Sequence, residues 1–168
     1  MKTSDTEPVR IFLGAPSILT QDQQTTLKQW TVWLEDQSFR VVRLGRDGHG
    51  DDPWHTLPRI LARVDGVVLL GFRQLDARHS VWRPDTDEEA PSSRWWTSPW
   101  LQLEAGMAVA LALPVLVAPE DDVEEGVFDP EVWNGQVNGA ELSTPGRAAD
   151  DWLDAVHARR VRHSGSSG

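Results

Sequence analysis

The sequence predicts a single α/β domain in which helices cover both faces of a mostly parallel β-sheet of four or five strands. Short apolar runs of strand length alternate with helical patterns along the chain, which is typical of successive βαβ units with right-handed crossovers. The stretch 66–72 (GVVLLGF) is almost wholly apolar, as a central parallel strand that is buried on both faces should be. The chain has 168 residues, which is about the size of one domain.

Each expected element has its own local signal. The expected strands are 9–13, 39–44, 66–72, 115–118 and, with a weaker pattern, 137–142. The expected helices are 22–36, a short one with Pro58 near its first turn, 100–113, and a last one after Thr144-Pro145. In the first helix, apolar residues recur at helical spacing: Leu27, Trp30, Trp33 and Leu34. In the last helix, the residues expected to face inward are Trp152, Leu153 and Val156.

The helix at 100–113 has the clearest start signal. Ser98 followed by Pro99 is typical of an N-cap residue and the first helical residue. We expect Met107, Ala108 and Leu111 to pack this helix against the sheet. The polar, tryptophan-containing stretch 74–97 before it is interpreted as a surface excursion. Residues 1–8 are expected to be disordered, 9–163 to form the domain, and 164–168 to be a flexible tail.

The strand order determines where a ligand would bind. We expect the flavodoxin-like order 2-1-3-4-5, in a three-layer domain, and open sheets of this kind bind ligands beyond the carboxyl ends of their strands. That edge would collect the loop of Gly14, Ala15, Pro16 and Ser17, the loop 46–50, the segment 72–74, and the start of the helix that carries Glu104.

Composition excludes several classes of function. The formal net charge of −10 argues against a nucleic-acid polymer and against an anionic membrane surface as partners. The chain has no cysteine, and its five histidines show no metal-ligand spacing, so we expect no metal site. The first eight residues contain no apolar run, so a cytoplasmic location is expected.

The segment 100–118 resembles a membrane span in length, because it holds a single charge in nineteen residues. Glu104 within it would be costly in hydrocarbon, Pro114 interrupts it, and an acidic run at 120–125 follows. A buried helix that leads into a buried strand explains this segment better. The acidic run itself is interpreted as a solvated loop.

Glu104 is the main candidate for chemistry, because it is a lone carboxylate in an apolar stretch. An unpaired buried carboxylate costs several kcal/mol, so it must reach a cleft, a partner or a proton. Burial would raise its pKa toward the range of acid–base chemistry, whereas its place near a helix N-terminus would help it stay largely ionised. The structural alternative is an ion pair with Arg73 or Arg94.

Other candidate sites give weaker signals. The Gly14–Ser17 loop lacks the spacing of a dinucleotide fingerprint, although its small side chains and Ser17 suit a phosphate or ribose. The Trp95-Trp96 pair would stack a base or pack under the long loop. Gly106, inside the expected helix, costs about 1 kcal/mol relative to alanine. It would permit close helix–sheet packing or the approach of a ligand, and packing is the favoured explanation.

The motif Ser98-x-Trp100-x-x-x-Glu104 resembles the αC segment of Toll/interleukin-receptor (TIR) domains, and in the NAD-cleaving members of that superfamily the motif glutamate is catalytic. The strand 9–13, the pair Arg46-Asp47 with Gly50, and the strand 65–70 resemble further TIR segments in the same order. The stretch 104–108 is also similar to nucleoside 2-deoxyribosyltransferase-like proteins. Leu101 stands where the TIR motif has cysteine.

The resemblance implies a TIR-like domain that cleaves the N-glycosidic bond of NAD or of a nucleoside or nucleotide, with Glu104 as the catalytic carboxylate and no required cofactor. Trp100 would form a wall of the pocket, and Phe72 and Arg73 would contact base and phosphate. The full set of implied substrate-binding residues is Gly14, Ala15, Pro16, Ser17, Arg46, Asp47, Phe72, Arg73, Ser98, Trp100 and Met107. The alternatives are a non-catalytic nucleotide sensor, a self-assembling signalling module that forms a homo-oligomer, and an accessory domain of a larger protein.

Overall fold

The computed structural model describes residues 7–44, 52–129, 132–133, 137–139, 142 and 145–165. Its main sheet consists of the parallel strands β1 (Arg10–Gly14), β2 (Arg40–Val42), β3 (Gly66–Gly71), β8 (Val115–Pro119) and β9 (Val137–Gly139). Their spatial order is β2-β1-β3-β8-β9. Counted in chain order, this is the predicted order 2-1-3-4-5, and the flavodoxin-like fold class is confirmed.

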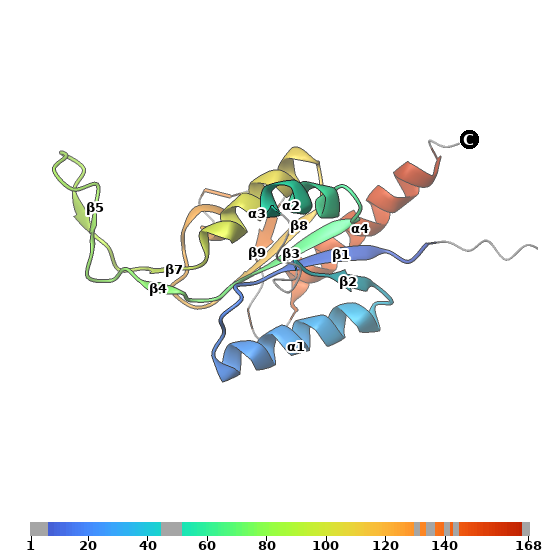
Figure 1. Cartoon of the computed structure of the whole chain (residues 1–168), viewed down its shortest axis with the longest axis horizontal. Helices are drawn as coiled ribbons and strands as arrows, with labels where there is room; N and C mark the ends of the chain where they lie inside the picture. Colours follow the sequence, from blue (N-terminus) through green and yellow to red (C-terminus); the bar gives the residue numbers. More distant parts are fainter. Residues whose placement is uncertain are drawn as a thin grey trace, which may run out of the picture.

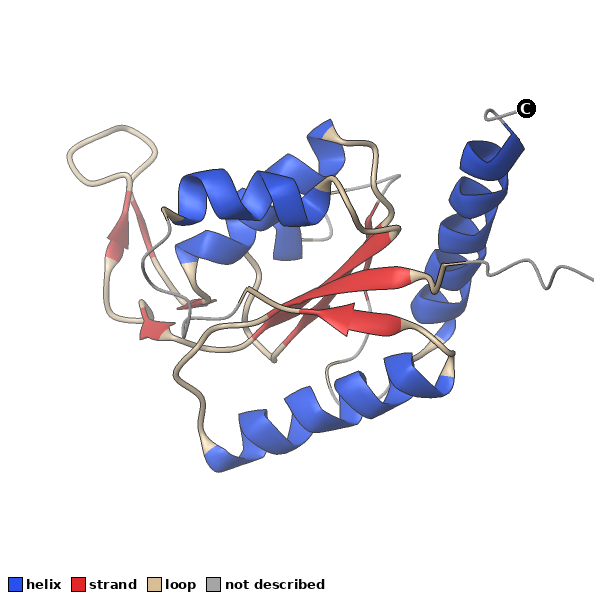
Figure 2. Ribbon diagram, turned by 45° about the vertical axis from the view of Figure 1, so that its right-hand side comes forward, coloured by secondary structure: helices blue, strands red, loops and turns tan. Residues whose placement is uncertain are grey.

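Helices cover both faces of this sheet and make the domain three-layered (Figures 1 and 2). α1 (Gln21–Asp36) and α4 (Arg147–Gly165) pack on one face, and α2 (Pro53–Leu61) and α3 (Pro99–Ala110) on the other. Successive strand residues point to opposite faces: Ile11 and Leu13 join the core under α1 and α4, whereas Phe12 joins the core under α2 and α3. The sheet therefore buries an apolar surface on each side.

Two of the nine tryptophans are wholly buried in the α1/α4 layer. Trp30 and Trp152 are both 0% exposed, and a buried indole N–H needs an acceptor. Trp30 donates to the carbonyl of Leu142 at 2.7 Å, and Trp152 donates to the carbonyl of Pro114 at 3.1 Å. Both contacts join helices to distant segments, so these tryptophans fix the outer layer onto the sheet.

α3 begins where the sequence predicts but ends earlier. The Ser98 side chain accepts a hydrogen bond from the Trp100 backbone N–H, so the predicted N-cap is confirmed. The helix ends at Ala110, and Ala112 adopts a left-handed φ of 51°. The N–H groups of Ala112 and Leu113 bond to the carbonyls of Val109 and Ala108, which is a Schellman motif placed just before the helix-breaking Pro114.

This ending changes which leucine is buried. Leu111 is 40% exposed, whereas Leu113 is 2% exposed, so the expectation that Leu111 packs against the sheet is wrong. Ala108 is fully buried as expected, and Met107 is partly buried against the same core. The Schellman turn reverses the chain after Leu111 and directs the next apolar side chain, Leu113, into the core. The expectation of close packing at Gly106 is also wrong, because an added Cβ there would meet no described atom within 4 Å.

Two other boundaries differ from the prediction. α2 begins with Pro53 at its first position, so Pro58 lies inside the helix and not in its first turn. α4 runs through Ser164 and Gly165, which the sequence assigned to a tail. The inward positions of α4 are confirmed, because Trp152 and Val156 are buried and Leu153 packs against them. Thr144 lies outside the described residues.

The predicted surface excursion is present and extends away from the sheet (Figure 1, left). It contains two short antiparallel pairs, β4 (Leu75–Asp76) with β7 (Trp95–Trp96) and β5 (Val81–Trp82) with β6 (Ala90–Pro91). A 3-10 turn, η1 (Gly126–Phe128), follows β8. Across the described ranges, no helix has both the length and the apolar content that a bilayer crossing requires.

Candidate functional site

Glu104 lies in the second turn of α3, and its carboxyl group packs directly against the carboxyl end of β1. The residue is only 5% exposed. A Cβ atom added at Gly14, the last residue of β1, would lie 2.3 Å from Oε2 of Glu104 and 2.7 Å from the Leu69 side chain. Only glycine leaves room for this approach. The fold therefore brings together two predicted site residues, Gly14 and Glu104, that are ninety positions apart.

The carboxyl group of Glu104 is poorly compensated. Within the described part of the chain, its Oε2 atom is buried and has no hydrogen-bond partner. Burial raises the pKa of Glu104 from its ordinary value of 4.5 to about 8, against the opposing charge of Arg43. At neutral pH the carboxyl is therefore mostly protonated, which differs from the expectation that the helix N-terminus would keep it largely ionised. Desolvation outweighs the helix dipole because the dipole contributes at most about 2 kcal/mol.

The expected structural alternative, an ion pair with Arg73 or Arg94, is not what the structure shows. Arg73 donates from Nε to the carbonyl of Asp121 at 2.8 Å and pairs with Asp122 at 3.4 Å. Arg94 pairs with Asp129 at 3.6 Å. The cation whose field reaches Glu104 is instead Arg43, which follows β2 directly.

Arg43 is a site residue that the sequence analysis missed. In the sheet register, Val42 of β2 lies beside Phe12 of β1. Arg43, which follows Val42, and Gly14, the last residue of β1, therefore lie at the same edge of the sheet. Burial lowers the pKa of Arg43 below its ordinary value, and the charge of Glu104 offsets only part of this decrease. An arginine at the end of an apolar strand was a usable signal, because strand ends in this fold collect ligand-binding side chains.

An aromatic pair connects the N-terminal parts of α2 and α3. The ring centroids of Trp54 and Trp100 are 5.3 Å apart, and both side chains are partly exposed, 58% and 36%. Trp100 lies one turn before Glu104, and Ser98, the N-cap, holds the start of that turn. Trp54 was not among the predicted site residues, because no pattern in the sequence linked it to the helix of Glu104. The pair offers an aromatic surface beside Glu104.

Phe72 does not share the site of Glu104. It is 0% exposed and belongs to the core under α1 and α4, whereas Glu104 is on α3, on the opposite face of the sheet. The expectation that Phe72 contacts a base is therefore wrong: residues alternate in direction along β3 and beyond its end, and Phe72 faces the other layer with Leu70.

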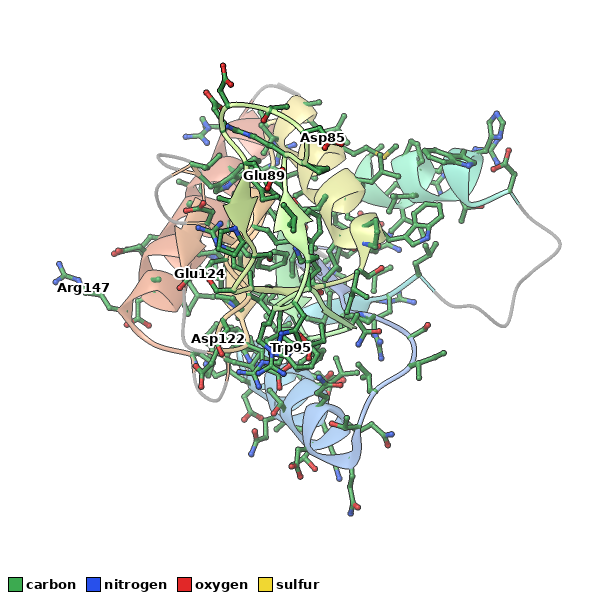
Figure 3. All side chains as sticks on the ribbon, turned by 90° about the vertical axis from the view of Figure 1, so that its left-hand side faces the viewer. Asp85, Glu89, Trp95, Asp122, Glu124 and Arg147 are labelled. Carbon is green, nitrogen blue, oxygen red and sulfur yellow. The ribbon has the colours of Figure 1, made fainter. Side chains whose placement is uncertain are left out.

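Arg73 lies at the carboxyl edge but is occupied by the acidic run, which is a structured part of the fold. Glu120 accepts from the Arg73 backbone N–H at 2.7 Å and from the Gln23 side chain at 2.9 Å. The Arg73 guanidinium also lies 5.5 Å from the ring centroid of Trp95. Trp95 and Asp122 lie close together in Figure 3. The backbone N–H of Trp95 donates a hydrogen bond to the carbonyl of Asp122 at 3.0 Å.

The loop after β1 is closely packed at its start and open at its end. Gly14 and Pro16 are buried, Ala15 is partly buried, and Ser17 is exposed. Ser17 is therefore the member of this loop whose side chain faces solvent. The predicted residues Arg46 and Asp47 lie outside the described residues.

A second buried carboxylate holds the start of α3 in place. Glu125 accepts a hydrogen bond from the Thr97 backbone N–H at 3.2 Å. Gln102 on α3 contacts the same segment, because its Oε1 accepts from the Val127 N–H at 2.9 Å. Gly126 has a φ of 53°, and a Cβ there would lie 2.3 Å from Gln102 Oε1. This segment after β8 positions the helix that carries Glu104.

The described ranges contain no group of three or more histidine, cysteine, aspartate or glutamate side chains that could hold a metal. Among the described residues, the site around Glu104 has one carboxyl, one nearby arginine and an aromatic pair as its polar and stacking groups. This set suits an organic ligand with a cationic or electron-poor centre.

Comparisons with known proteins give distant matches of structure. No protein-family model matches the chain, and no curated protein matches it significantly. The chain is similar to the solved structure of the Clostridium botulinum CMP N-glycosidase BcmB, with a TM-score of 0.49 and 13% identity over 86% of this chain and 96% of that chain. It is also similar to a prokaryotic SEFIR domain, with a TM-score of 0.39 and 12% identity over 90% of each chain.

Proposed function

We propose that this domain cleaves the N-glycosidic bond of a nucleotide, with NAD as the preferred substrate and Glu104 as the catalytic carboxylate. The observation that carries the proposal is the position of the Glu104 carboxyl group. It is buried against Gly14 at the carboxyl edge of the sheet, and its Oε2 atom has no partner among the described residues. A residue whose only role was structural would be expected to have its charge or its hydrogen bonds satisfied.

Cleavage of NAD would break the bond between C1′ of the ribose and the nicotinamide nitrogen. The bonding electron pair leaves with the nitrogen, so nicotinamide departs as a neutral molecule and C1′ acquires oxocarbenium character. Water then adds to C1′ and releases a proton, which gives ADP-ribose. In this scheme Glu104, in its ionised form, stabilises the positive charge on the sugar, and no cofactor takes part.

The raised pKa of Glu104 favours a cationic substrate. A buried carboxyl with a pKa of about 8 ionises more readily when a positive charge is placed beside it. The nicotinamide ring of NAD carries such a charge, whereas the base of an ordinary nucleoside is neutral. The partly exposed rings of Trp54 and Trp100 provide a stacking surface for a cationic ring.

The test is to incubate the protein with NAD, with CMP and with unphosphorylated nucleosides, and to measure the released base by chromatography. We expect nicotinamide release from NAD, and Glu104→Gln should lower its rate by about 10²-fold or more, because the charge is lost while the shape is kept. Glu35→Gln is the matched control, since it makes the same change at an exposed carboxyl of α1, on the opposite face of the sheet, and should leave the activity intact. The proposal is wrong if the wild-type protein releases no base from any of these compounds, or if Glu104→Gln keeps the wild-type rate.

A further inference from the structure

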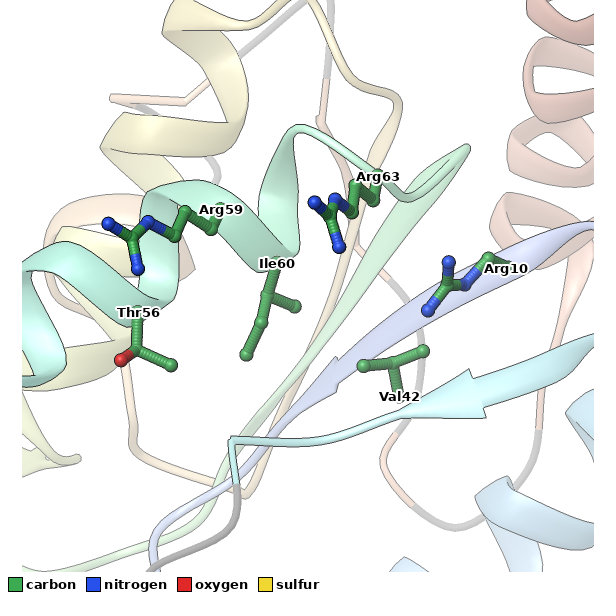
Figure 4. Close-up of a pocket in the computed structure, with 6 residues that line it drawn as sticks. All are labelled: Arg10, Val42, Thr56, Arg59, Ile60 and Arg63. Atoms are coloured by element: carbon green, nitrogen blue, oxygen red, sulfur yellow. The ribbon is translucent and has the colours of Figure 1, made fainter. Parts of the chain in front are cut away.

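A hollow lined by arginines lies between α2 and the β1–β2 edge of the sheet (Figure 4). Its volume is about 220 Å³. The side chains that line it are Arg10, Val42, Thr56, Arg59, Ile60 and Arg63. Three of these six residues are arginines, in a chain whose formal net charge is −10, so the positive charge here is a local concentration.

Helical spacing brings four of these residues to one side of the hollow. Thr56, Arg59, Ile60 and Arg63 follow one another at i, i+3, i+4 and i+7, which places them on one side of α2 and its continuation. Arg10 and Val42 approach from β1 and β2, and Figure 4 shows their side chains across from those of α2. Val42 and Ile60 pack against the core under α2 and α3 and give the hollow an apolar floor.

The guanidinium groups of this hollow are not paired with a carboxylate in the described part of the chain. None of Arg10, Arg59 and Arg63 forms an ion pair there through its guanidinium group. The Nε atom of Arg10 is buried without a hydrogen-bond partner, which is costly for a charged donor. Asp65, at the same end of β1, is already engaged: it accepts from the Arg10 backbone N–H at 2.9 Å and pairs with Arg160 at 3.1 Å.

We propose that this hollow binds a phosphate group. Guanidinium groups bind phosphate oxygens through paired N–H donors, and a phosphate dianion would offset the mutual repulsion of three cations better than a single carboxylate would. The Thr56 hydroxyl adds a neutral donor, and the unpartnered Nε of Arg10 gains an acceptor. Arg10 precedes Gly14 by four residues, which corresponds to about 13 Å along a strand, so this site is separate from the Glu104 carboxyl and does not depend on the proposed cleavage.

The test is isothermal titration calorimetry with inorganic phosphate, AMP and adenosine, in sodium chloride of matched ionic strength. We expect phosphate and AMP to bind the wild-type protein at this hollow. The double variant Arg59→Gln/Arg63→Gln should bind phosphate about 100-fold more weakly, which is roughly tenfold for each charge-assisted hydrogen-bonding group. Both residues are exposed, so the variant should fold, and circular dichroism would verify this.

Two control variants test whether the phosphate binds at this hollow. Arg147→Gln removes one exposed positive charge at the start of α4, away from α2 in Figure 3, and should leave phosphate affinity unchanged. Glu104→Gln should also leave it unchanged, even if the proposed cleavage activity fails. Tighter binding of AMP than of phosphate would identify a nucleotide as the source of the group, and equal affinity would identify free phosphate. The proposal is overturned if the wild-type protein binds no phosphate, or if the double variant binds it as tightly as the wild type.

Discussion

Glu104→Gln should stabilise the protein, and the gain should increase with pH. In the folded state the pKa of Glu104 is raised from 4.5 to about 8, so between these values the folded chain holds a proton that the unfolded chain has lost. Linkage then requires that the free energy of unfolding falls as pH rises through this window. The carboxyl costs nothing below pH 4.5, where it is protonated in both states, and its cost is complete above pH 8. Glutamine does not titrate and escapes this cost.

The size of the effect follows from the shift. The rise of the Glu104 pKa from 4.5 to about 8 corresponds to roughly 5 kcal/mol at about 1.36 kcal/mol for each pH unit. The residue is too buried for solvent screening to reduce this greatly. Because pH 7 lies about 2.5 pH units above the unfolded-state pKa of 4.5, the stability gained by the variant at pH 7 should exceed that at pH 4 by roughly 3 kcal/mol. For a domain of this size, this is about 6–12 °C in the midpoint of thermal unfolding.

The assay is urea denaturation of the wild type and the variant at pH 4, 7 and 9, and the measured quantity is the difference between their free energies of unfolding. Other titrating groups are present in both proteins and cancel in this difference. Glu124→Gln, which removes an exposed carboxyl, controls for the change in net charge. If the free energy of unfolding of the variant minus that of the wild type does not change with pH, the interpretation of Glu104 as a buried, unpartnered carboxyl is refuted. If this difference falls as pH rises, Glu104 is held in an ion pair.

Three further predictions follow from the same contacts. If Glu104 acts in its ionised form, kcat/KM for NAD should rise with pH to a plateau. The half-maximum should lie near the pKa of Glu104, which is about 8. A kcat/KM that falls over this pH range would show that Glu104 acts as an acid. Gly14→Ala should lower the free energy of unfolding by about 1–3 kcal/mol, since its Cβ would lie 2.3 Å from Glu104 Oε2, and an unchanged urea midpoint would contradict this packing. Leu113→Ala should cost about 2–5 kcal/mol and Leu111→Ala less than about 1 kcal/mol, because Leu113 is 2% and Leu111 40% exposed; denaturation of both variants would test the end of α3.

The prediction of the fold succeeded where a local pattern was sufficient. The strand 66–72 could be recognised because every residue that is buried on both faces of a parallel sheet must be apolar. The start of α3 could be recognised because Ser98 and Pro99 satisfy a local requirement of the helix N-terminus. The end of α3 could not, because Ala112 adopts a left-handed φ of 51° that is usually given to glycine, and nothing in its own side chain signals it.

The candidate site divides in the same way. The isolation of Glu104 in an apolar segment already indicated a buried carboxyl. The expected strand order also predicted that Gly14 and Glu104 share the carboxyl edge of the sheet. Arg43, whose charge reaches Glu104, and Trp54, which contacts Trp100, come from other elements, and only the packing of β2 and α2 beside α3 brings them to this site. Phe72 was assigned to the wrong face because a strand's end residue is equally consistent with either layer until the register is known.

By itself, the sequence determined the α/β class, the order of its elements and one carboxyl that the core would have to accommodate, because apolar periodicity and an unpaired charge are properties of a single segment. The tertiary structure decided the protonation of that carboxyl and the arginine that opposes it. It also gathered Arg10, Arg59 and Arg63 around one hollow. These properties depend on distances and solvent exclusion between segments far apart in the chain, and such distances exist only once the layers have packed.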